Sequence, residues 1–168
     1  MLSKNKQYDY GDSRICSPQA AMFRVVCSRP DKHLSGKIVS PFFAETEIFS
    51  DIGELILKLD DMCELLSCPM ASTQRRSLGK GDCKLSIQQK PLLEEELQNN
   101  FNPYHIREVN NLEIDNASKK VFLIHVVCRQ HSAMQGVITV FQRPYHKQHF
   151  RSALELMRMI DASVRAKT

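Results

Sequence analysis

Cysteine and histidine are the residue types in this 168-residue chain that could carry catalysis. Cys128 lies three residues from both His125 and His131, and a thiolate–imidazole pair could be assembled from them. Such a catalyst needs an exposed thiol of low pKa and a third group that orients the imidazole. Because Cys128 ends an apolar run and no orienting group is evident, we predict that the chain is not an enzyme. A cysteine-dependent enzyme remains a second alternative.

Metal binding is the next chemistry that these residue types suggest. Cys63 and Cys68 are separated by four residues, and no Cys-x-x-Cys pair occurs in the chain. Structural zinc sites usually show more closely spaced ligand pairs. We therefore predict no metal and no other cofactor, and we interpret the remaining candidates as surface imidazoles: His125, His131, His146 and His149.

Two further motifs are weak candidates for chemistry. The segment Gly79-Lys80-Gly81-Asp82 lacks the spacing of a phosphate-binding P-loop and the Ser or Thr that follows it, so it is interpreted as a turn. Asp60 and Asp161 occupy equivalent places in two similar segments and could act as paired carboxylates. Solvation near a helix end is the simpler explanation for both. The sequence therefore predicts no catalytic residues.

The charges are unevenly distributed, although the net charge is only +4. Acidic residues dominate positions 45–64, and basic residues dominate from position 119 onward. Solvated faces are the ordinary explanation, and a site for an anion or nucleic acid is the sharper one. No Trp is present and aromatic residues make up 7%, so platforms for base stacking are scarce. The candidate contacts to an anion or nucleic acid are Arg29, Arg129, Arg143, Lys147, Arg151 and Arg158.

A C-terminal amphipathic helix must position the last of these bases. Ser152 and Glu155 have the spacing of a capping box, in which the carboxylate of Glu155 reaches back to the backbone N–H of Ser152. The apolar stripe that follows has helical spacing and consists of Leu154, Met157, Ile160 and Val164.

A similar segment lies about a hundred residues earlier. Residues 49–60 align with residues 150–161, and Asp51 and Glu54 replace the cap residues Ser152 and Glu155. Upstream, residues 23–29 align with residues 123–129, and each run is followed by a glycine at the same distance, Gly36 or Gly136. Three segments that agree in order and spacing predict two copies of a strand–strand–helix unit.

The motifs of the second copy also resemble a group of short proteins from clostridial-type Firmicutes. In one-letter code the motifs are RQ at 129–130, QGVITV at 135–140, FRSALEL at 150–156 and ID at 160–161. Gly36, Ser40-Pro41, Phe49, Asp60, Pro69 and Arg75-Arg76-Ser77 are similar to the front half of longer members. Met134 stands where many members have an aromatic residue. The resemblance implies a bacterial, cytoplasmic protein and brings no activity with it.

The predicted fold class is α+β, with two ββα repeats that form one antiparallel sheet and helices packed on one face. Residues 1–21 are interpreted as an N-terminal arm, 22–68 as the first repeat, 69–120 as a polar linker with minor elements, and 121–168 as the second repeat. The expected core residues are Phe23, Val25, Ile38, Phe49, Ile52, Leu55, Ile56, Leu59, Ile124, Val126, Val137, Ile138, Phe150, Leu154, Met157 and Ile160.

These features together predict a function in binding. No apolar run is long enough to cross a membrane, and no signal segment is evident, so we expect a cytoplasmic protein with six free thiols. With a duplicated scaffold and no catalytic set, we expect a non-catalytic binding or regulatory module that acts through protein contacts. Its partner would be another protein or a second copy of the chain. Nucleic-acid binding through the basic second repeat is the alternative.

Overall fold

A six-stranded antiparallel sheet with two helices is the framework of the protein. The computed structural model describes residues 21–28, 33–78, 84–92, 119–131, 133–141 and 145–166. The strand order is β3-β2-β1-β4-β5-β6, so the predicted α+β class is confirmed. The elements are β1 (Met22–Ser28), β2 (Ser35–Val39), β3 (Glu47–Phe49), α1 (Ile52–Leu66), β4 (Lys119–Gln130), β5 (Ala133–Val140), β6 (His146–Phe150) and α4 (Ala153–Arg165).

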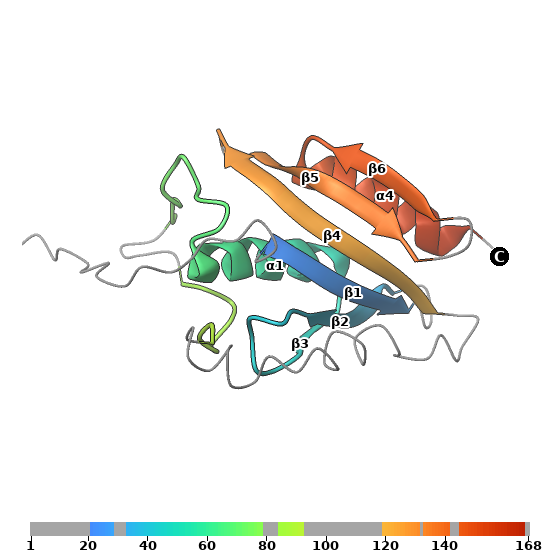
Figure 1. Ribbon diagram of the computed structural model, residues 1–168, viewed down its shortest axis with the longest axis horizontal. Coiled ribbons are helices and arrows are strands. Elements are labelled where there is room, and N and C mark those ends of the chain that lie inside the picture. The colour runs from blue at the N-terminus through green and yellow to red at the C-terminus, as the bar shows by residue number, and fades with distance from the viewer. Residues whose placement is uncertain are drawn as a thin grey trace, which may run out of the picture.

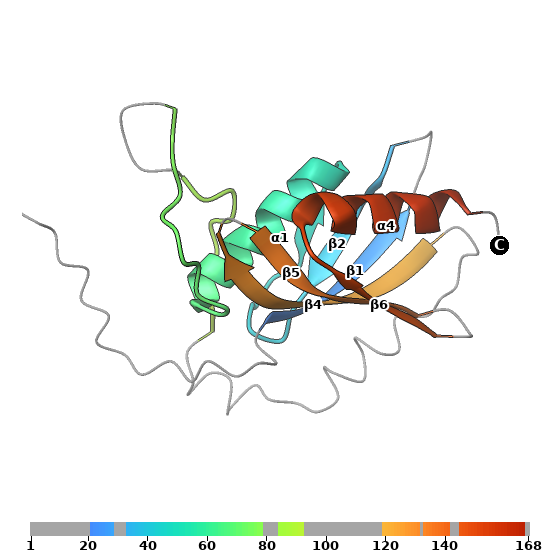
Figure 2. The same ribbon diagram turned by 90° about the horizontal axis from the view of Figure 1, so that it is seen from above.

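The long strand β4 lies at the centre of the molecule. Figure 1 shows it running diagonally between β1, β2 and β3 on one side and β5 and β6 on the other. Figure 2 shows α1 and α4 on the same face of the sheet, as the sequence predicts. We call this face the helix face and the opposite one the outer face.

Each half of the chain contains three strands before its helix, so the predicted ββα units are in fact βββα units. Strand β6 was not predicted, because its residues, HKQHF, show no apolar alternation. Four of the five are exposed. Strand β3 has three residues and was not predicted as a separate strand. Both short strands lie at the edges of the sheet, where pairing with one neighbour defines them.

Matched caps start the two helices. The side chains of Asp51 and Ser152 accept hydrogen bonds from the backbone N–H groups of Glu54 and Glu155, at 2.8 and 3.1 Å. The carboxylate of Glu155 reaches back to the N–H of Arg151 at 2.7 Å, one residue before the position predicted. Glu54 reaches the N–H of Ser50 in the same way, at 2.8 Å. These bonds satisfy backbone donors that have no partner within a helix.

A glycine beneath a phenylalanine ring occurs in both halves. Gly36 pairs with Phe49 across β2 and β3, and Gly136 pairs with Phe150 across β5 and β6. A Cβ atom on Gly36 would lie 2.7 Å from Cζ of Phe49, and one on Gly136 would lie 2.8 Å from Cζ of Phe150. Each would also overlap a backbone carbonyl of the neighbouring strand. The ring and the adjacent strand occupy the space that a side chain would need, so these positions require glycine.

The core lies between the helices and the helix face of the sheet. Eleven of the expected core residues are buried: Phe23, Val25, Ile38, Phe49, Leu55, Leu59, Ile124, Val126, Ile138, Phe150 and Ile160. Ile52 and Ile56 are partly buried and pack against this core.

Three of the expected core residues were placed wrongly. Leu154 is 56% exposed, and Leu156 is buried in its place. Met157 is half-buried, because α4 contains several apolar residues and the stripe selected from the sequence was rotated away from the face that packs. Val137 is also half-buried, since it alternates with Ile138 and therefore points to the outer face.

Several predictions fall on residues outside the described ranges. These are most of the N-terminal arm and the parts of the linker at residues 79–83 and 93–118, where minor elements were expected. The described part of the linker does contact the core: Ile87 is 5% exposed, and the N–H of Leu92 donates to the carbonyl of Phe42 at 2.9 Å. Among the described helices, neither is long and apolar enough to cross a membrane.

Candidate functional site

A bulge in β4 brings Arg129 onto the helix face. The register between β4 and β5 shifts between Val126 and Cys128, which leaves Val127 as the extra residue. Without this insertion, Val126 and Arg129 would point to opposite faces, because strand side chains alternate. With it, both point toward the helices, and Arg129 is only 5% exposed.

Arg129 uses its guanidinium to join three segments of the chain. Its Nε donates to Asp60 Oδ1 at 2.9 Å and its Nη2 to Glu64 Oε2 at 2.8 Å, both on α1. Its Nη1 donates to the carbonyl oxygen of Pro69 at 3.3 Å, just beyond that helix. The backbone of Arg129 also accepts a hydrogen bond from the N–H of Ser72 at 3.1 Å. A buried guanidinium requires such pairing, because an uncompensated buried charge is costly.

Arg75 extends the same cluster in the segment after α1. Its guanidinium contacts Asp60 at 2.5 Å and also donates to Asp61. Asp61 accepts two further hydrogen bonds from Ser86, one from its backbone N–H at 2.5 Å and one from its hydroxyl group. Burial alone lowers the pKa of Arg75, but its contacts with Asp61 and Asp60 raise that pKa above the ordinary value overall. The cluster therefore holds Pro69, Arg75 and Ser86 against α1.

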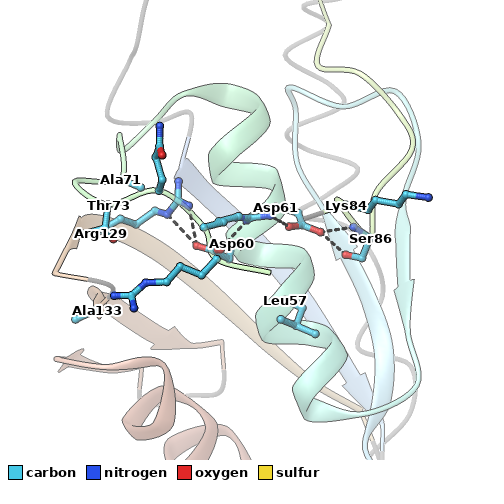
Figure 3. A pocket seen from close by; sticks show the side chains of 12 residues that line it. Leu57, Asp60, Asp61, Ala71, Thr73, Lys84, Ser86, Arg129 and Ala133 are labelled. Carbon is cyan, nitrogen blue, oxygen red and sulfur yellow. Dashed lines mark hydrogen bonds and ion pairs between the residues drawn. The ribbon is translucent and has the colours of Figure 1, made fainter. Parts of the chain in front are cut away.

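A cavity of about 630 Å³ opens beside this cluster. Figure 3 shows Asp61 facing Ser86, Arg129 directed toward Asp60, and the side chain of Lys84 extending away from them. The volume suits a small molecule. However, Asp60, Asp61 and Arg129 are engaged with other side chains, which suits a structural clamp. The lining residues are Leu57, Asp60, Asp61, Ala71, Thr73, Gln74, Arg75, Arg76, Lys84, Ser86, Arg129 and Ala133.

The predicted anion contacts do not form one patch among the described residues. Arg129 is buried and paired with carboxylates, so its guanidinium is not open to a phosphate. Lys147 on β6, Arg151 in the turn before α4, and Arg158 on α4 are exposed. Arg151 contacts Glu155 at 3.4 Å, with its side chain 87% exposed. Arg29 and Arg143 lie outside the described residues.

The cysteines differ from the sequence expectation at one position. Cys68 is disulfide-bonded, so the prediction of six free thiols is wrong there; pairing depends on proximity in the fold, which spacing does not reveal. Cys27 and Cys63 are free and buried, and burial raises the pKa of each thiol to about 12. Such thiols are poor nucleophiles. Cys128 is free and half-buried. Among the described residues, no group of three His, Cys, Asp or Glu side chains is placed to hold a metal ion.

The outer face of the sheet has a distinct composition. Glu47 is the sole carboxylate in the six strands, and its register with Ile38 places it on the helix face, where it contacts Lys58 at 3.2 Å. Alternation assigns bases and apolar residues to the outer face of the described strands, and no acid. These residues include Met22, Arg24, Val26, Lys37, Val39, Ile48, Val121, Leu123, His125, Val127, Val137, Thr139, Lys147 and His149.

Arg24 lies near the middle of the outer face. It pairs with Val39 of β2 and Leu123 of β4 and is 6% exposed. Its Nε is buried without a hydrogen-bond partner, and no carboxylate of the described residues contacts its guanidinium. The ring of Phe141 lies 5.9 Å from the guanidinium carbon, at cation–π distance. Burial lowers the pKa of Arg24.

The residues that organise these two regions were mostly absent from the sequence predictions. Arg24, Arg75 and Asp61 were not candidates, because neither their spacing nor their neighbours indicated a site. Alternation along β1 could have identified Arg24 as a base between apolar neighbours. Comparisons of the chain with protein-family models, with curated proteins and with solved structures found no match.

Proposed function

We propose that this chain is a non-catalytic binding module that acts through protein contacts. Its partner binds on the outer face of the sheet, opposite α1 and α4. The observation that supports this most directly is the composition of that face, which combines apolar and basic side chains and carries no carboxylate on the described strands.

The exposure of the outer face supports a protein partner. Val26, Leu123 and Val137 are half-buried and Val127 is 56% exposed, whereas Arg24 and Val121 on the same face are buried. At one edge of the sheet, Ile48 is 71% exposed. Apolar side chains flanked by charges are typical of surfaces that bind other proteins. In addition, the residues of β6 pair with β5, and no described strand pairs with its other side. Such an edge accepts an extended segment.

Nucleic-acid binding is the second candidate, and the exposure of Lys147, Arg151 and Arg158 favours it. These bases are spread over β6, the turn that follows, and α4. A duplex or single strand would have to pass around one edge of the sheet to contact all three. Arg129, the fourth described candidate, is engaged with Asp60 and Glu64. A compact basic groove is therefore absent from the described part of the second half.

Site-specific photo-crosslinking can test the protein-binding proposal. Val127 on the outer face and Leu154 on α4 are each 56% exposed, so they form a matched pair. A photoreactive residue at Val127 should form a discrete adduct with one protein in an extract of the source cells, and the same residue at Leu154 should not. Mass spectrometry then identifies the partner, and the complex is rebuilt from purified components.

In the rebuilt complex, Val127→Glu should weaken binding at least about tenfold, because it places a charge at an apolar contact. Leu154→Glu should leave the affinity within about twofold, as expected for a residue outside the interface. Equal effects of the two variants would refute the outer face as the binding surface. Adducts with RNA or DNA at Val127 would favour the second candidate instead.

A further inference from the structure

We propose that Arg24 is the anchor of the outer face and that it binds a carboxylate of an acidic partner peptide. This inference rests on the proposed protein-binding function and specifies the chemistry of its partner. Arg24 was not among the site residues predicted from the sequence. Its neighbours on the outer face are mostly apolar.

Arg24 without a partner costs the isolated chain free energy. Arg24 as a residue is 6% exposed, so its side chain has lost much of its hydration, and its buried Nε has no hydrogen-bond partner. A buried charge without a counter-ion is strongly unfavourable, and proteins normally pair it with a carboxylate. Arg129 on the helix face, which is 5% exposed, shows the usual solution with Asp60 and Glu64. Arg24 has the same burial without the same partners among the described residues.

The guanidinium of Arg24 can still bind a ligand. Its buried atom without a partner is Nε; the two terminal nitrogens are not among the buried atoms that lack a partner, and no hydrogen bond from the described residues engages them. The end of the side chain therefore keeps the remaining exposure. The Phe141 ring lies over the guanidinium, 5.9 Å from its carbon. The terminal nitrogens of a guanidinium suit a bidentate contact with the two oxygens of a carboxylate.

The surroundings of Arg24 favour a carboxylate of a peptide over a phosphate of a nucleic acid. The side chains beside Arg24 are Val39 and Leu123, with Met22 and Val26 two residues away on the same strand. This surrounding suits apolar side chains of a peptide that flank an acidic one. A nucleic acid would instead require free rings for its bases, and the Phe141 ring at this site is already packed over the guanidinium and against the Tyr145 ring.

The decisive variant is Arg24→Met, which keeps an unbranched apolar side chain at this position and removes the guanidinium and its charge. In the isolated chain its Tm should equal or exceed that of the wild type, because the variant removes an unpaired buried charge. A fall in Tm of about 10 °C or more would overturn the proposal. It would show that an acid within the chain already pairs with Arg24.

Binding is measured by fluorescence anisotropy with a labelled short peptide in which glutamate alternates with valine. The matched probes are the same peptide with glutamine in place of glutamate, and a single-stranded RNA of similar length. The wild type should prefer the glutamate peptide. Arg24→Met should weaken that binding at least about 30-fold and abolish the preference, as removal of one partner of a buried charge pair does. Lys147→Met, an exposed base on the same face, should cost at most about fivefold.

Three outcomes of the binding measurements would also overturn the assignment. The first is that the wild type does not bind the glutamate peptide, or binds both peptides equally. The second is that Arg24→Met and Lys147→Met weaken binding equally. The third is that RNA binds better than the glutamate peptide and depends on Arg24. If Val127→Glu still disrupts the complex with the crosslinked partner in the first two cases, the proposed function stands and only the role of Arg24 fails.

Discussion

Arg129 on β4 donates to Asp60 on α1 at 2.9 Å, across 69 residues of sequence. The contact exists because the bulge at Val127 turns Arg129 toward the helices. It connects the last strand residues before the β4–β5 turn with the C-terminal half of α1. Through Asp60 it also connects with Arg75, which contacts the same carboxylate.

Substitution of Arg129 by methionine should destabilise the fold. The variant removes the counter-ion of Glu64 and one of the two that contact Asp60, which is only 34% exposed. Because both carboxylates keep some solvent, the free energy of unfolding should fall by about 2–4 kcal/mol, less than for a fully enclosed pair. Urea denaturation measures the loss. Arg165→Met is the control: its pair with Asp161 is 2.7 Å long, but the Arg165 side chain is 63% exposed. It should cost at most about 1 kcal/mol.

Two glycine substitutions should differ in their effect on stability. Gly36→Ala places a Cβ atom against the Phe49 ring and a strand carbonyl, so the free energy of unfolding should fall by about 1–3 kcal/mol or more. Gly53→Ala places its Cβ atom 3.1 Å from Asp51 Oδ1, in the first turn of α1. Alanine favours the helix there, which offsets the close contact, so the change should stay within about 1 kcal/mol. Thermal and urea unfolding compare the two. Equal losses would contradict the packing described for Gly36.

The orientation of α4 predicts a difference between two neighbouring leucines. Leu156 is fully buried, whereas Leu154 is 56% exposed. Leu156→Ala should cost about 2–5 kcal/mol, because it removes buried methyl groups and leaves a cavity. Leu154→Ala should change the free energy of unfolding by less than about 1 kcal/mol. Urea denaturation of both variants measures the contrast, and the reverse order would show that α4 packs with its other apolar stripe.

The cap of α1 should contribute stability that depends on pH. Hydrogen bonds from the side chain and backbone of Ser50 lower the pKa of Glu54 from 4.5 to about 2. Since the pKa is lower in the folded state, the stabilisation is complete above about pH 4.5 and is lost as the pH falls toward about 2. The side chain of Glu54 is 34% exposed, so solvent screening limits the contribution to about 1 kcal/mol or less.

Glu54→Gln tests this contribution. The wild type should be more stable than the variant near neutral pH, and the difference should shrink through the acidic window. Urea denaturation at a series of pH values gives both curves. Glu155→Gln should show a difference of the same sign in the other half, because the N–H of Arg151 lowers the pKa of Glu155. A difference that is constant with pH would contradict the role of the cap carboxylate.

Local patterns predicted those parts of the fold that depend on neighbouring residues. Asp51 and Ser152 were identified as caps because a capping box involves residues three positions apart. The central strands and the inward-facing Phe23 and Ile124 followed from apolar runs. Even the matched glycines were identified from spacing, although their contact with Phe49 and Phe150 was not.

Features that depend on distant contacts were not predicted. No local signal marks the residues of β6 as a strand, because its pairing with β5 supplies the structure. Arg129 was considered an anion contact because the bulge that turns it inward is invisible in the sequence. The apolar residues of α4 allowed more than one stripe, and only packing against the sheet selects Leu156 over Leu154. The disulfide of Cys68 likewise depends on the fold.

Strand β4 continues past the first residue of β1, since Met22 pairs with His125 and five strand residues follow. Ala71 occupies this overhang as a parallel bridge to Arg129, and the Ser72 hydroxyl accepts from the N–H of His131 at 2.9 Å. The segment after α1 is thereby joined to the β4–β5 turn by backbone as well as side chain. If the segment after α1 detaches, the β4–β5 turn loses its contacts as well. The amide hydrogens of Ser72 and His131 should therefore exchange with solvent in a single cooperative event.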